Sequence, residues 1–231
     1  ASYSPNLLNQ YDSRTVPGAV DVTGIALAGS GVQVNGQTPI TQGDYFHHEL
    51  PVANTAGPVW QPVTVSATGQ PATSGHVFVA QTPELFVHDA DGNLTQDGRW
   101  SYTWDTENRL VAMESIGTVP EAARARLVFH YDWQGRRIQK EVYDWNPGTS
   151  SYDLATVTRF VYDGWNLLAV LQSDFTLLQS FAWGLDLSGT EQGAGGVGGL
   201  LWVNDAGTLG GQSSTHFCAY DGNGNVMALV D

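Results

Sequence analysis

Phe129-His130-Tyr131-Asp132 is one of six copies of a four-residue motif that recurs between Phe86 and Asp231. Positions one and three of the motif are mostly aromatic, and five copies end in Asp. Side chains two residues apart on a strand share one face, so each copy predicts a strand that buries its two rings together. The other copies are Phe86-Val87-His88-Asp89, Tyr102-Thr103-Trp104-Asp105, Phe160-Val161-Tyr162-Asp163, Phe181-Ala182-Trp183-Gly184 and Cys218-Ala219-Tyr220-Asp221.

A turn signal follows the motif at a fixed distance. Gly and Asn tolerate a positive φ, and an Asp side chain bonds backbone amides a few residues downstream. Each copy that keeps the Asp therefore predicts a strand that ends in a tight turn, and the irregular spacing of the copies predicts a meander of hairpins with variable loops. The Gly or Asn three residues after the Asp is Gly92, Asn108, Gly135, Asn166 or Gly224.

These units resemble the YD repeat of the Rhs and teneurin families. The run from Tyr131 to Arg136 is similar to the family's Tyr-Asp-x-x-Gly-Arg unit, and the run from His88 to Leu94 is similar to its Asp-x-x-Gly-Asn-Leu variant. Residues 183–200 and 220–226 resemble the entry to the Rhs repeat-associated core. The resemblance covers the last three fifths of the chain.

The resemblance implies a spiral sheet that curls into a hollow shell around a C-terminal toxin or effector. It implies two partners, the remaining YD repeats of a longer protein and the enclosed C-terminal domain. In Rhs proteins the core ends in an autoproteolytic aspartate motif, which would lie beyond Asp231, so no catalytic residue is carried over. The same resemblance implies a secreted or cell-surface location.

The composition favours strands and excludes several partners. Only 14% of the 231 residues are charged, whereas Gly, aromatic and small polar residues are plentiful, which predicts an all-β protein. The net charge of −14 would repel nucleic acid and anionic membranes, and no apolar run is long enough to cross a bilayer. We therefore expect no nucleic-acid partner and no membrane insertion.

The first part of the chain has a different rhythm. Short alternating strands, with a strong turn signal at Asn35-Gly36, predict an immunoglobulin-like β-sandwich, although the two cysteines of antibody domains are missing. We expect three regions: residues 1–13 as the end of a preceding shell hairpin, residues 14–83 as an Ig-like insertion, and residues 84–231 as a YD-repeat shell segment that enters the Rhs core.

Three groups of side chains suggest metal sites, but we assign no metal and no cofactor to any of them. Two loops place oxygen side chains at positions one, three and five, as calcium loops do, but they lack the later ligands of an EF-hand. Turn formation explains these loops better, and calcium stays open. His47, His48 and Glu49 are consecutive, so neighbours point to opposite faces of a strand. The two loops are Asp89, Asp91, Asn93 and Asp221, Asn223, Asn225.

The sequence offers no recognisable catalytic motif. The single cysteine, Cys218, lies on an expected strand without a nucleophile motif around it, and the Gly-rich run 189–199 lacks the Lys of a phosphate-binding loop. We therefore predict a protein that is not an enzyme. The acids that a hidden hydrolase could use have no common setting in the sequence; they are Glu107, Glu114, Glu141 and Glu191.

The leading hypothesis is a structural segment of a large bacterial Rhs-type protein whose shell encloses or presents a toxin. One alternative is a carbohydrate-binding or adhesion module, with sugar as the partner and exposed tryptophans as the contact. A second alternative is a hydrolase that uses acidic loop residues. Because the strands at both ends would lack neighbours, we expect the isolated chain to associate. The tryptophans in question are Trp60, Trp133, Trp145 and Trp165.

Overall fold

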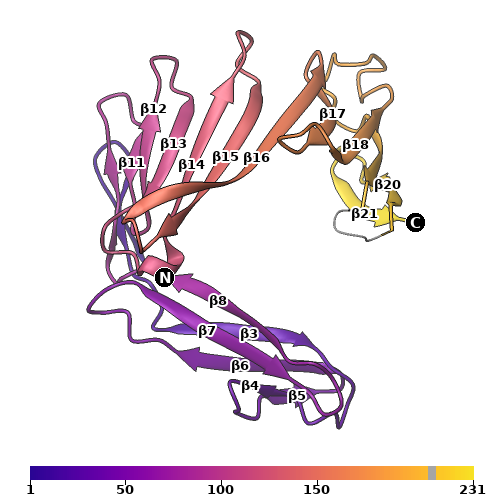
Figure 1. Ribbon diagram of the computed structural model, residues 1–231. Helices are drawn as coiled ribbons and strands as arrows, with labels where there is room; N and C mark the ends of the chain where they lie inside the picture. Colours follow the sequence, from indigo (N-terminus) through magenta and orange to yellow (C-terminus); the bar gives the residue numbers. More distant parts are fainter. Residues whose placement is uncertain (208–211) are drawn as a thin grey trace. The chain divides into compact units, whose positions relative to one another are not determined.

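The computed structural model describes residues 1–207 and 212–231, and these residues form strands joined by turns (Figure 1). The described residues contain one short helical turn, η1 at Glu121–Ala123. The predicted all-β class is confirmed, with antiparallel pairing in each sheet. The chain divides into two compact units, residues 1–126 with 145–151 and residues 127–144 with 152–231.

Two three-stranded sheets in the first unit share a core. One sheet has the order β3-β6-β5 and the other the order β4-β7-β8 (Figure 1). Val34 and Phe46, from opposite sheets, lie in one buried cluster with Val32 and Leu50. The alternating apolar residues of these strands therefore meet between two layers. The bounds are β3 Ala19–Ile25, β4 Gln33–Val34, β5 Ile40–Gln42, β6 Tyr45–Pro51, β7 Val59–Ser66 and β8 Thr73–Val79.

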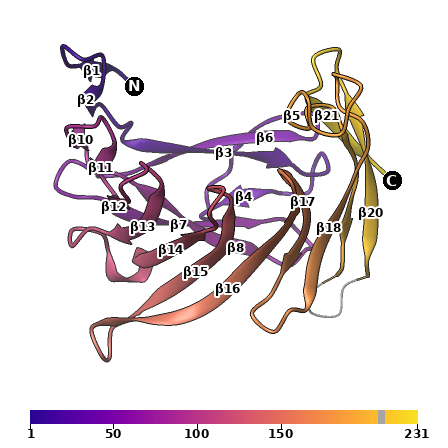
Figure 2. The ribbon, with the colours of Figure 1, turned by 90° about the horizontal axis from the view of Figure 1, so that it is seen from above.

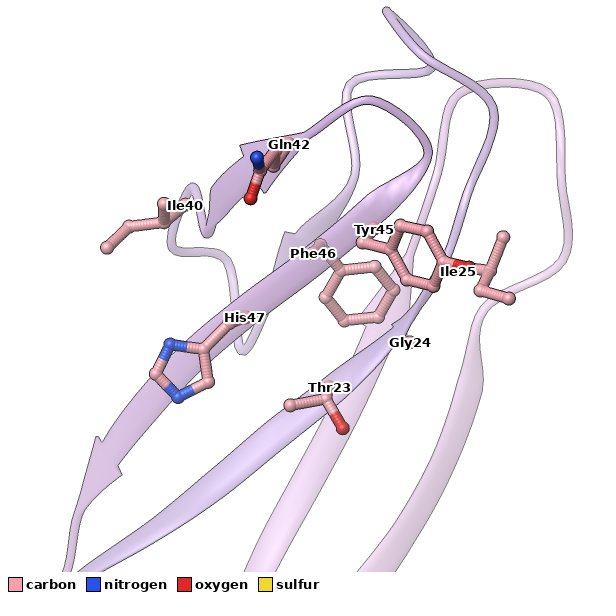
Figure 3. A pocket seen from close by; sticks show the side chains of 8 residues that line it. All are labelled: Thr23, Gly24, Ile25, Ile40, Gln42, Tyr45, Phe46 and His47. Carbon is pink, nitrogen blue, oxygen red and sulfur yellow. The ribbon is translucent and has the colours of Figure 1, made fainter.

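Gly24 makes room for the largest side chain of this core. Strand β3 pairs Gly24 with Phe46 of β6, and the Phe46 ring lies against the glycine (Figure 3). A Cβ atom at Gly24 would stand 2.6 Å from two ring atoms, closer than van der Waals contact allows. A glycine inside a strand is otherwise unfavourable, so its presence here reflects this close approach.

We expect the substitution Gly24→Ala to destabilise the first unit by about 1–3 kcal/mol, because the methyl group must displace a buried ring. Urea unfolding followed by near-UV circular dichroism measures the loss. Gly75→Ala is the matched control, because a Cβ at Gly75, also inside a strand, meets no atom within 4 Å. Equal midpoints for the two variants would show that the packing of Phe46 on Gly24 contributes nothing.

The chain segments directly before and after the two packed sheets, β3-β6-β5 and β4-β7-β8, are bonded to each other. We refer to these two sheets together as the two-layered region. Strand β2 (Tyr11–Arg14) pairs with β1 (Tyr3–Pro5) on one side and with β9 (Glu84–Leu85) on the other. We call residues 14–18 and 80–84 the neck. The backbone N–H of Val16 donates to the Thr82 hydroxyl at 3.1 Å across the neck.

The Asn54 side chain is hydrogen-bonded to both segments of the neck. It is 1% exposed and donates to the carbonyl of Ala80 at 2.9 Å and to that of Pro17 at 3.4 Å. The backbone carbonyl of Asn54 accepts the Thr82 N–H at 3.0 Å. One buried amide therefore ties both chain crossings together.

The strands that carry the aromatic motif follow one another in the sheet as they do in the sequence. In the first unit the order is β10-β11-β12-β13, and in the second it runs from β14 to β21, of which β16 to β18 can be followed in Figure 2. Among the described residues of the second unit, Phe129 is the one hydrophobic side chain that is buried. The strands of this unit therefore do not enclose a thick hydrophobic core. The bounds are β10 Val87–His88, β11 Leu94–Gln96, β12 Trp100–Trp104, β13 Leu110–Ser115, β14 Ala125–Tyr131, β15 Arg137–Asn146, β16 Ser151–Asp163, β17 Asn166–Leu171, β18 Leu177–Trp183, β19 Leu200–Asp205, β20 Ser214–Tyr220 and β21 Val226–Val230.

The motif rings behave as the alternation predicts. Positions one and three are buried or half-buried in all six copies, whereas position two is exposed in five of them. The ring at position three often bonds the backbone of another strand of the same sheet: Trp104 donates to the Leu94 carbonyl at 2.8 Å, and Trp183 donates to the Leu167 carbonyl at 2.7 Å. Tyr162 likewise donates to the carbonyl of Arg137 at 3.1 Å.

Candidate functional site

Four motif aspartates close their turns in the same way. One carboxylate oxygen of Asp132 accepts the backbone N–H groups of Gln134 and Arg136 at 2.9 and 3.0 Å. The other oxygen accepts the Arg136 guanidinium at 2.7 Å. The same pattern, with an Asn or Arg four residues on, recurs at Asp89, Asp105 and Asp221.

These bonds set the ionisation of the capping aspartates. At Asp105 the backbone N–H of Arg109 is the main cause that lowers the pKa of the carboxyl below its ordinary value. At Asp221 the side-chain amide of Asn225 is the main cause of a lowered pKa. Each carboxylate is thus held ionised as an acceptor for its own turn.

The loops considered for calcium use their oxygens in this way. Asp89 accepts from Asp91 N–H, Asn93 N–H and the Asn93 side chain, so donors occupy the carboxylate that a cation would need. Among residues 1–207 and 212–231, no group of three or more His, Cys, Asp and Glu side chains is arranged to hold a metal ion. His47, considered as a ligand, instead lies 2.7 Å from Asp21 across the strand pair.

Glu84 anchors a polar cluster beside the neck. Its carboxylate is 5% exposed and accepts the Arg14 guanidinium and the Gly98 N–H. This cluster joins β9 to β2 and to the turn that follows β11. A buried charge with this many partners holds the local geometry, because removal of one partner would leave the other uncompensated.

Asp97 extends the cluster. Its carboxylate accepts the backbone N–H groups of Arg99 and Trp100 and the Tyr102 hydroxyl, each at 2.7 Å. Burial, followed by the bond to Asp97, raises the pKa of Tyr102. The Arg99 guanidinium stacks over the rings of Phe78 and Trp100, 4.8 Å from each centroid. These contacts connect the turn after β11 to β12 and to Phe78 of β8.

Asp186 is a site that the sequence motifs did not reveal. The residue is 6% exposed, and its carboxylate accepts Ser188 N–H at 2.9 Å, Ala194 N–H at 2.6 Å and Gly196 N–H at 3.2 Å. The Ser188 hydroxyl is the first cause, and the amides further causes, that lower its pKa to about 2. The Gly-rich run is therefore folded around a buried carboxylate, and the only signal in the sequence was an Asp beside many glycines.

A polar cleft lies between this Gly-rich segment and the turn from β16 to β17. Its volume is about 330 Å³, and its lining includes Asp163, Asn166, Glu191 and Gln192. Asp163 differs from the four capping aspartates: it stands opposite Asn166 across a two-residue turn, and its exposed side chain lines the cleft. The Gln192 carboxamide fixes the turn by accepting from Trp165 N–H at 3.0 Å and donating to the Asp163 carbonyl at 2.9 Å.

The four tryptophans considered for sugar binding divide into two pairs. Trp133 is 88% exposed and Trp165 is 60% exposed, and both lie in turns of the second unit. Trp60 stacks on His76 with centroids 5.2 Å apart, and Trp145 lies under the Arg124 guanidinium. Only the first pair offers open ring faces.

The acids considered for a hydrolase have separate settings. Glu107 pairs with Arg109 at 2.8 Å, Glu114 faces Arg126 at 3.7 Å, and Glu141 lies 3.0 Å from His130. Glu191 lines the polar cleft with Asp163. The carboxylates of three of these four glutamates therefore face an arginine or a histidine side chain.

Ser214, His216 and Asp231 lie in the order of a hydrolytic triad. The Ser214 hydroxyl is 3.1 Å from Nε2 of His216, and Nδ1 is 2.5 Å from the Asp231 carboxylate. Ser214 and His216 are alternate residues of β20, so strand geometry alone places them on one face. The Asp231 side chain is 91% exposed, and water weakens the orientation that a triad needs. The contact is explained without catalysis.

A hollow in the two-layered region is apolar. Its volume is about 490 Å³, and Ile25, Ile40 and Tyr45 line it together with Phe46 (Figure 3). Ile25, Ile40 and Tyr45 are each more than two thirds exposed. This surface resembles a packing face more than a site with convergent polar groups.

Comparison with curated proteins finds relatives that are named as nucleases. The chain is 29% identical over 150 residues to the tRNA3(Ser)-specific nuclease WapA of Bacillus spizizenii, a match that covers 64% of this chain and 5% of the relative. It is 33% identical over 103 residues to the tRNA nuclease WapA of Bacillus subtilis strain 168, covering 44% of this chain and 4% of the relative. A tRNA(Glu)-specific nuclease WapA of Bacillus subtilis subsp. natto matches equally. No protein-family model matches the chain.

The prediction of a protein that is not an enzyme is wrong in the light of these relatives. They are named as tRNA nucleases, and nucleases are enzymes. The sequence argument failed because it searched for catalytic motifs in these 231 residues, whereas the chain spans only 4–5% of the length of the relatives it matches. A function named for a whole protein need not be visible in such a small share of it.

Proposed function

We propose that the chain is a sheet-forming wall segment of a much larger Rhs-type toxin protein that carries nuclease activity. The observation that carries this proposal is the repeated Asp-capped turn, in which Asp89, Asp105, Asp132 and Asp221 make the same bonds. Because each aspartate bonds amides of its own turn, successive hairpins can form without a thick hydrophobic core. A thin, continuous sheet of this kind is what the wall of a shell requires. The match to the WapA nucleases supports the toxin class, and the enclosed or presented toxin domain remains the proposed partner.

Residues 14–83 are, in this proposal, an Ig-like module inserted between two neighbouring wall strands. Support comes from the pairing of β2 with β9, which places Arg14 opposite Glu84. Two short sheets with a common core between them also suit such a module. This arrangement supports the proposed boundaries, 1–13, 14–83 and 84–231.

The location proposed for the whole protein is outside the cell, secreted or on the surface, as the Rhs resemblance implies. In the described residues, no helix is both long and apolar enough to span a bilayer. The nuclease activity is proposed for the longer protein, by analogy with the relatives. The predicted lack of a nucleic-acid partner stays a prediction for this chain, whose charge of −14 opposes phosphate contacts.

A wall segment should associate through its edge. Strand β21 has β20 as its neighbour on one side, and all five of its residues are exposed, among them Val226, Met227, Leu229 and Val230. Open strands with apolar side chains pair readily with other chains. We expect light scattering of the isolated chain to show an apparent mass that rises with concentration.

The control is a longer protein with the neighbouring repeats that this proposal implies, which we expect to be monodisperse. A Met227→Lys, Leu229→Lys variant of the isolated chain should also associate less, because charges on an edge strand oppose pairing. An isolated chain that stays a monodisperse monomer over the concentration series would contradict the wall proposal.

A further inference from the structure

The last part of the chain carries acidic residues without any lysine or arginine. Residues 160–231 contain no Lys and no Arg, so the basic side chains that could pair with these acids come from earlier in the chain or from another molecule. A segment of one charge sign attracts partners of the opposite sign. The acidic residues of this segment are Asp163, Asp174, Asp186, Glu191, Asp205, Asp221 and Asp231.

Arginines of the chain lie over the aromatic rings of several earlier motif copies. The Arg14 guanidinium lies 5.9 Å from the centroid of Phe86. The Arg137 guanidinium lies 5.5 Å from the centroid of Phe129 and 5.1 Å from that of Phe160. A guanidinium on a ring face gains a cation–π attraction and keeps its N–H groups free to donate. An arginine on the motif rings is therefore a recurrent contact in this protein.

The fifth motif copy has the rings without the arginine. Phe181 and Trp183 line the polar cleft together with the apolar residues Leu168 and Leu185. Within residues 1–207 and 212–231, no guanidinium lies over either of the two rings. This hydrophobic wall suits the aliphatic stem of a long basic side chain.

The polar wall of the cleft has acceptors that the protein does not use. Asp163 and Glu191 are exposed, and in the described part of the chain neither carboxylate has a hydrogen-bond or ion-pair partner. Asn166 lines the same cleft and is 7% exposed, and its carboxamide is likewise unpaired among these residues. Buried polar side chains are normally hydrogen-bonded, so the Asn166 amide indicates the place of a ligand group.

The arginine that approaches this wall has other partners. Arg136 donates to the carbonyl of Gly164, in the turn between β16 and β17. Its guanidinium is paired with Asp132 at 2.7 Å and lies over the Tyr162 ring, 5.4 Å from the centroid. The cation that would balance the cleft carboxylates therefore has to come from a ligand.

We propose that the cleft binds an arginine side chain of a partner polypeptide. The guanidinium donates to the carboxylates of Asp163 and Glu191 and to the side-chain oxygen of Asn166. Its stem and flat face lie against Phe181 and Trp183. A volume of about 330 Å³ holds one such side chain and part of the backbone that carries it. Lysine fits less well, because an ammonium group cannot form two parallel bonds to a carboxylate.

The test uses the full chain immobilised at low density, so that association between chains does not interfere, with binding measured by surface plasmon resonance. The probes are blocked pentapeptides, acetyl-Ala-Gly-Xaa-Gly-Ala-amide, with arginine, lysine or citrulline at the central position. Citrulline keeps the shape of arginine and lacks its charge. We expect the arginine peptide to bind about tenfold more tightly than the citrulline peptide, with the lysine peptide between them.

A pair of double variants shows whether the cleft is the site. Asp163→Asn with Glu191→Gln should weaken binding of the arginine peptide about tenfold or more, because both charged acceptors are lost. Glu49→Gln with Asp91→Asn is the matched control, since it removes two exposed carboxylates from the other unit. It should leave binding unchanged. The replaced side chains are exposed, so circular dichroism spectra should match that of the original chain.

The proposal is overturned if the arginine peptide does not bind, if the citrulline peptide binds equally, or if the cleft variant binds as tightly as the original chain. An equal loss in the control variant also overturns it, because net charge alone would then cause the attraction. The same holds if the free cleft variant no longer associates while no peptide binds, since the cleft would then be a contact between copies. The light-scattering test of the wall proposal needs no peptide, so the two proposals can fail separately.

Discussion

The substitution Asn54→Asp is expected to destabilise the first unit by roughly 3 kcal/mol or more at pH 7, although it changes the size of the side chain very little. Asn54 donates to the carbonyl groups of Ala80 and Pro17 from a position that is 1% exposed. A carboxylate there cannot donate, and it would face two carbonyl oxygens without water. Residues 14–18 and 80–84 would then lose the side-chain hydrogen bonds that join both segments to residue 54.

The pH dependence of this variant identifies the cause. Burial near carbonyl groups should raise the pKa of the introduced carboxyl in the folded state above its unfolded value of about 3.9. The penalty should therefore be smallest below pH 4, where the group is protonated and can donate, and it should grow as the pH rises. Urea unfolding at pH 4 and pH 7, with the original chain as reference at each pH, measures it.

Asn54→Ala is the matched control, because it removes the donors and introduces no charge. Its cost should be about 1–3 kcal/mol and should not change between pH 4 and pH 7. If Asn54→Asp and Asn54→Ala lost equal stability at both pH values, the introduced carboxylate would add no penalty of its own, and the account of Asn54 as a buried donor that faces two carbonyl oxygens would be wrong.

The substitution Asp186→Asn is expected to open the Gly-rich segment. The carboxylate accepts amide groups on both oxygens, from Ser188 on one and from Ala194 and Gly196 on the other. An asparagine has one oxygen and one NH₂ group, so one set of donors would face another donor. We expect the amides of Ala194 and Gly196 to lose protection from hydrogen exchange and the thermal midpoint to fall by several degrees.

The effect of pH follows from the lowered pKa of Asp186, about 2 in the folded state. A group whose pKa is depressed by folding stabilises the protein above its unfolded pKa, near 3.8, and loses that contribution as the pH falls toward 2. The difference between Asp186→Asn and the original chain should therefore be full at pH 7 and should shrink between pH 4 and pH 2.

Asp91→Asn serves as the control for the charge change, because Asp91 is exposed in a turn where its backbone N–H, bonded to Asp89, remains. It should leave the exchange of Ala194 and Gly196 unaltered. Unchanged protection in Asp186→Asn itself would mean that the glycines hold their conformation without the carboxylate.

The sequence predicted best where bonds are local. Asp132 caps amides two and four residues away, so a fixed spacing in the sequence carries the whole turn. The aromatic alternation is equally local, and the burial of motif positions one and three follows it. Asp163 departs from the rule because Gly164, with a φ of 53°, closes a shorter turn that leaves its carboxylate free to line the cleft.

Long-range partners were beyond prediction. The bond from Ala194 to Asp186 and the ion pair of Arg14 with Glu84 join residues whose types are common in the chain, so no spacing singles them out. The same holds for exposure: Trp133 and Trp145 look alike in the sequence, but only the first is open to solvent. The candidate cleft depends on both kinds of information, which explains why the sequence analysis named Asp163, Asn166 and Glu191 without joining them and missed Gln192.

The pairing of successive strands has a consequence for the order in which the protein folds. From β16 to β21 each strand hydrogen-bonds the one made just before it, so these hairpins can close while the rest of the polypeptide is still being synthesised. The pairing of β2 with β9 cannot, since Arg14 must wait for a partner 70 residues further on. The ribosome must therefore have released residues 15–83 before β2 and β9 can pair, so the neck closes after the module that it encloses has been synthesised.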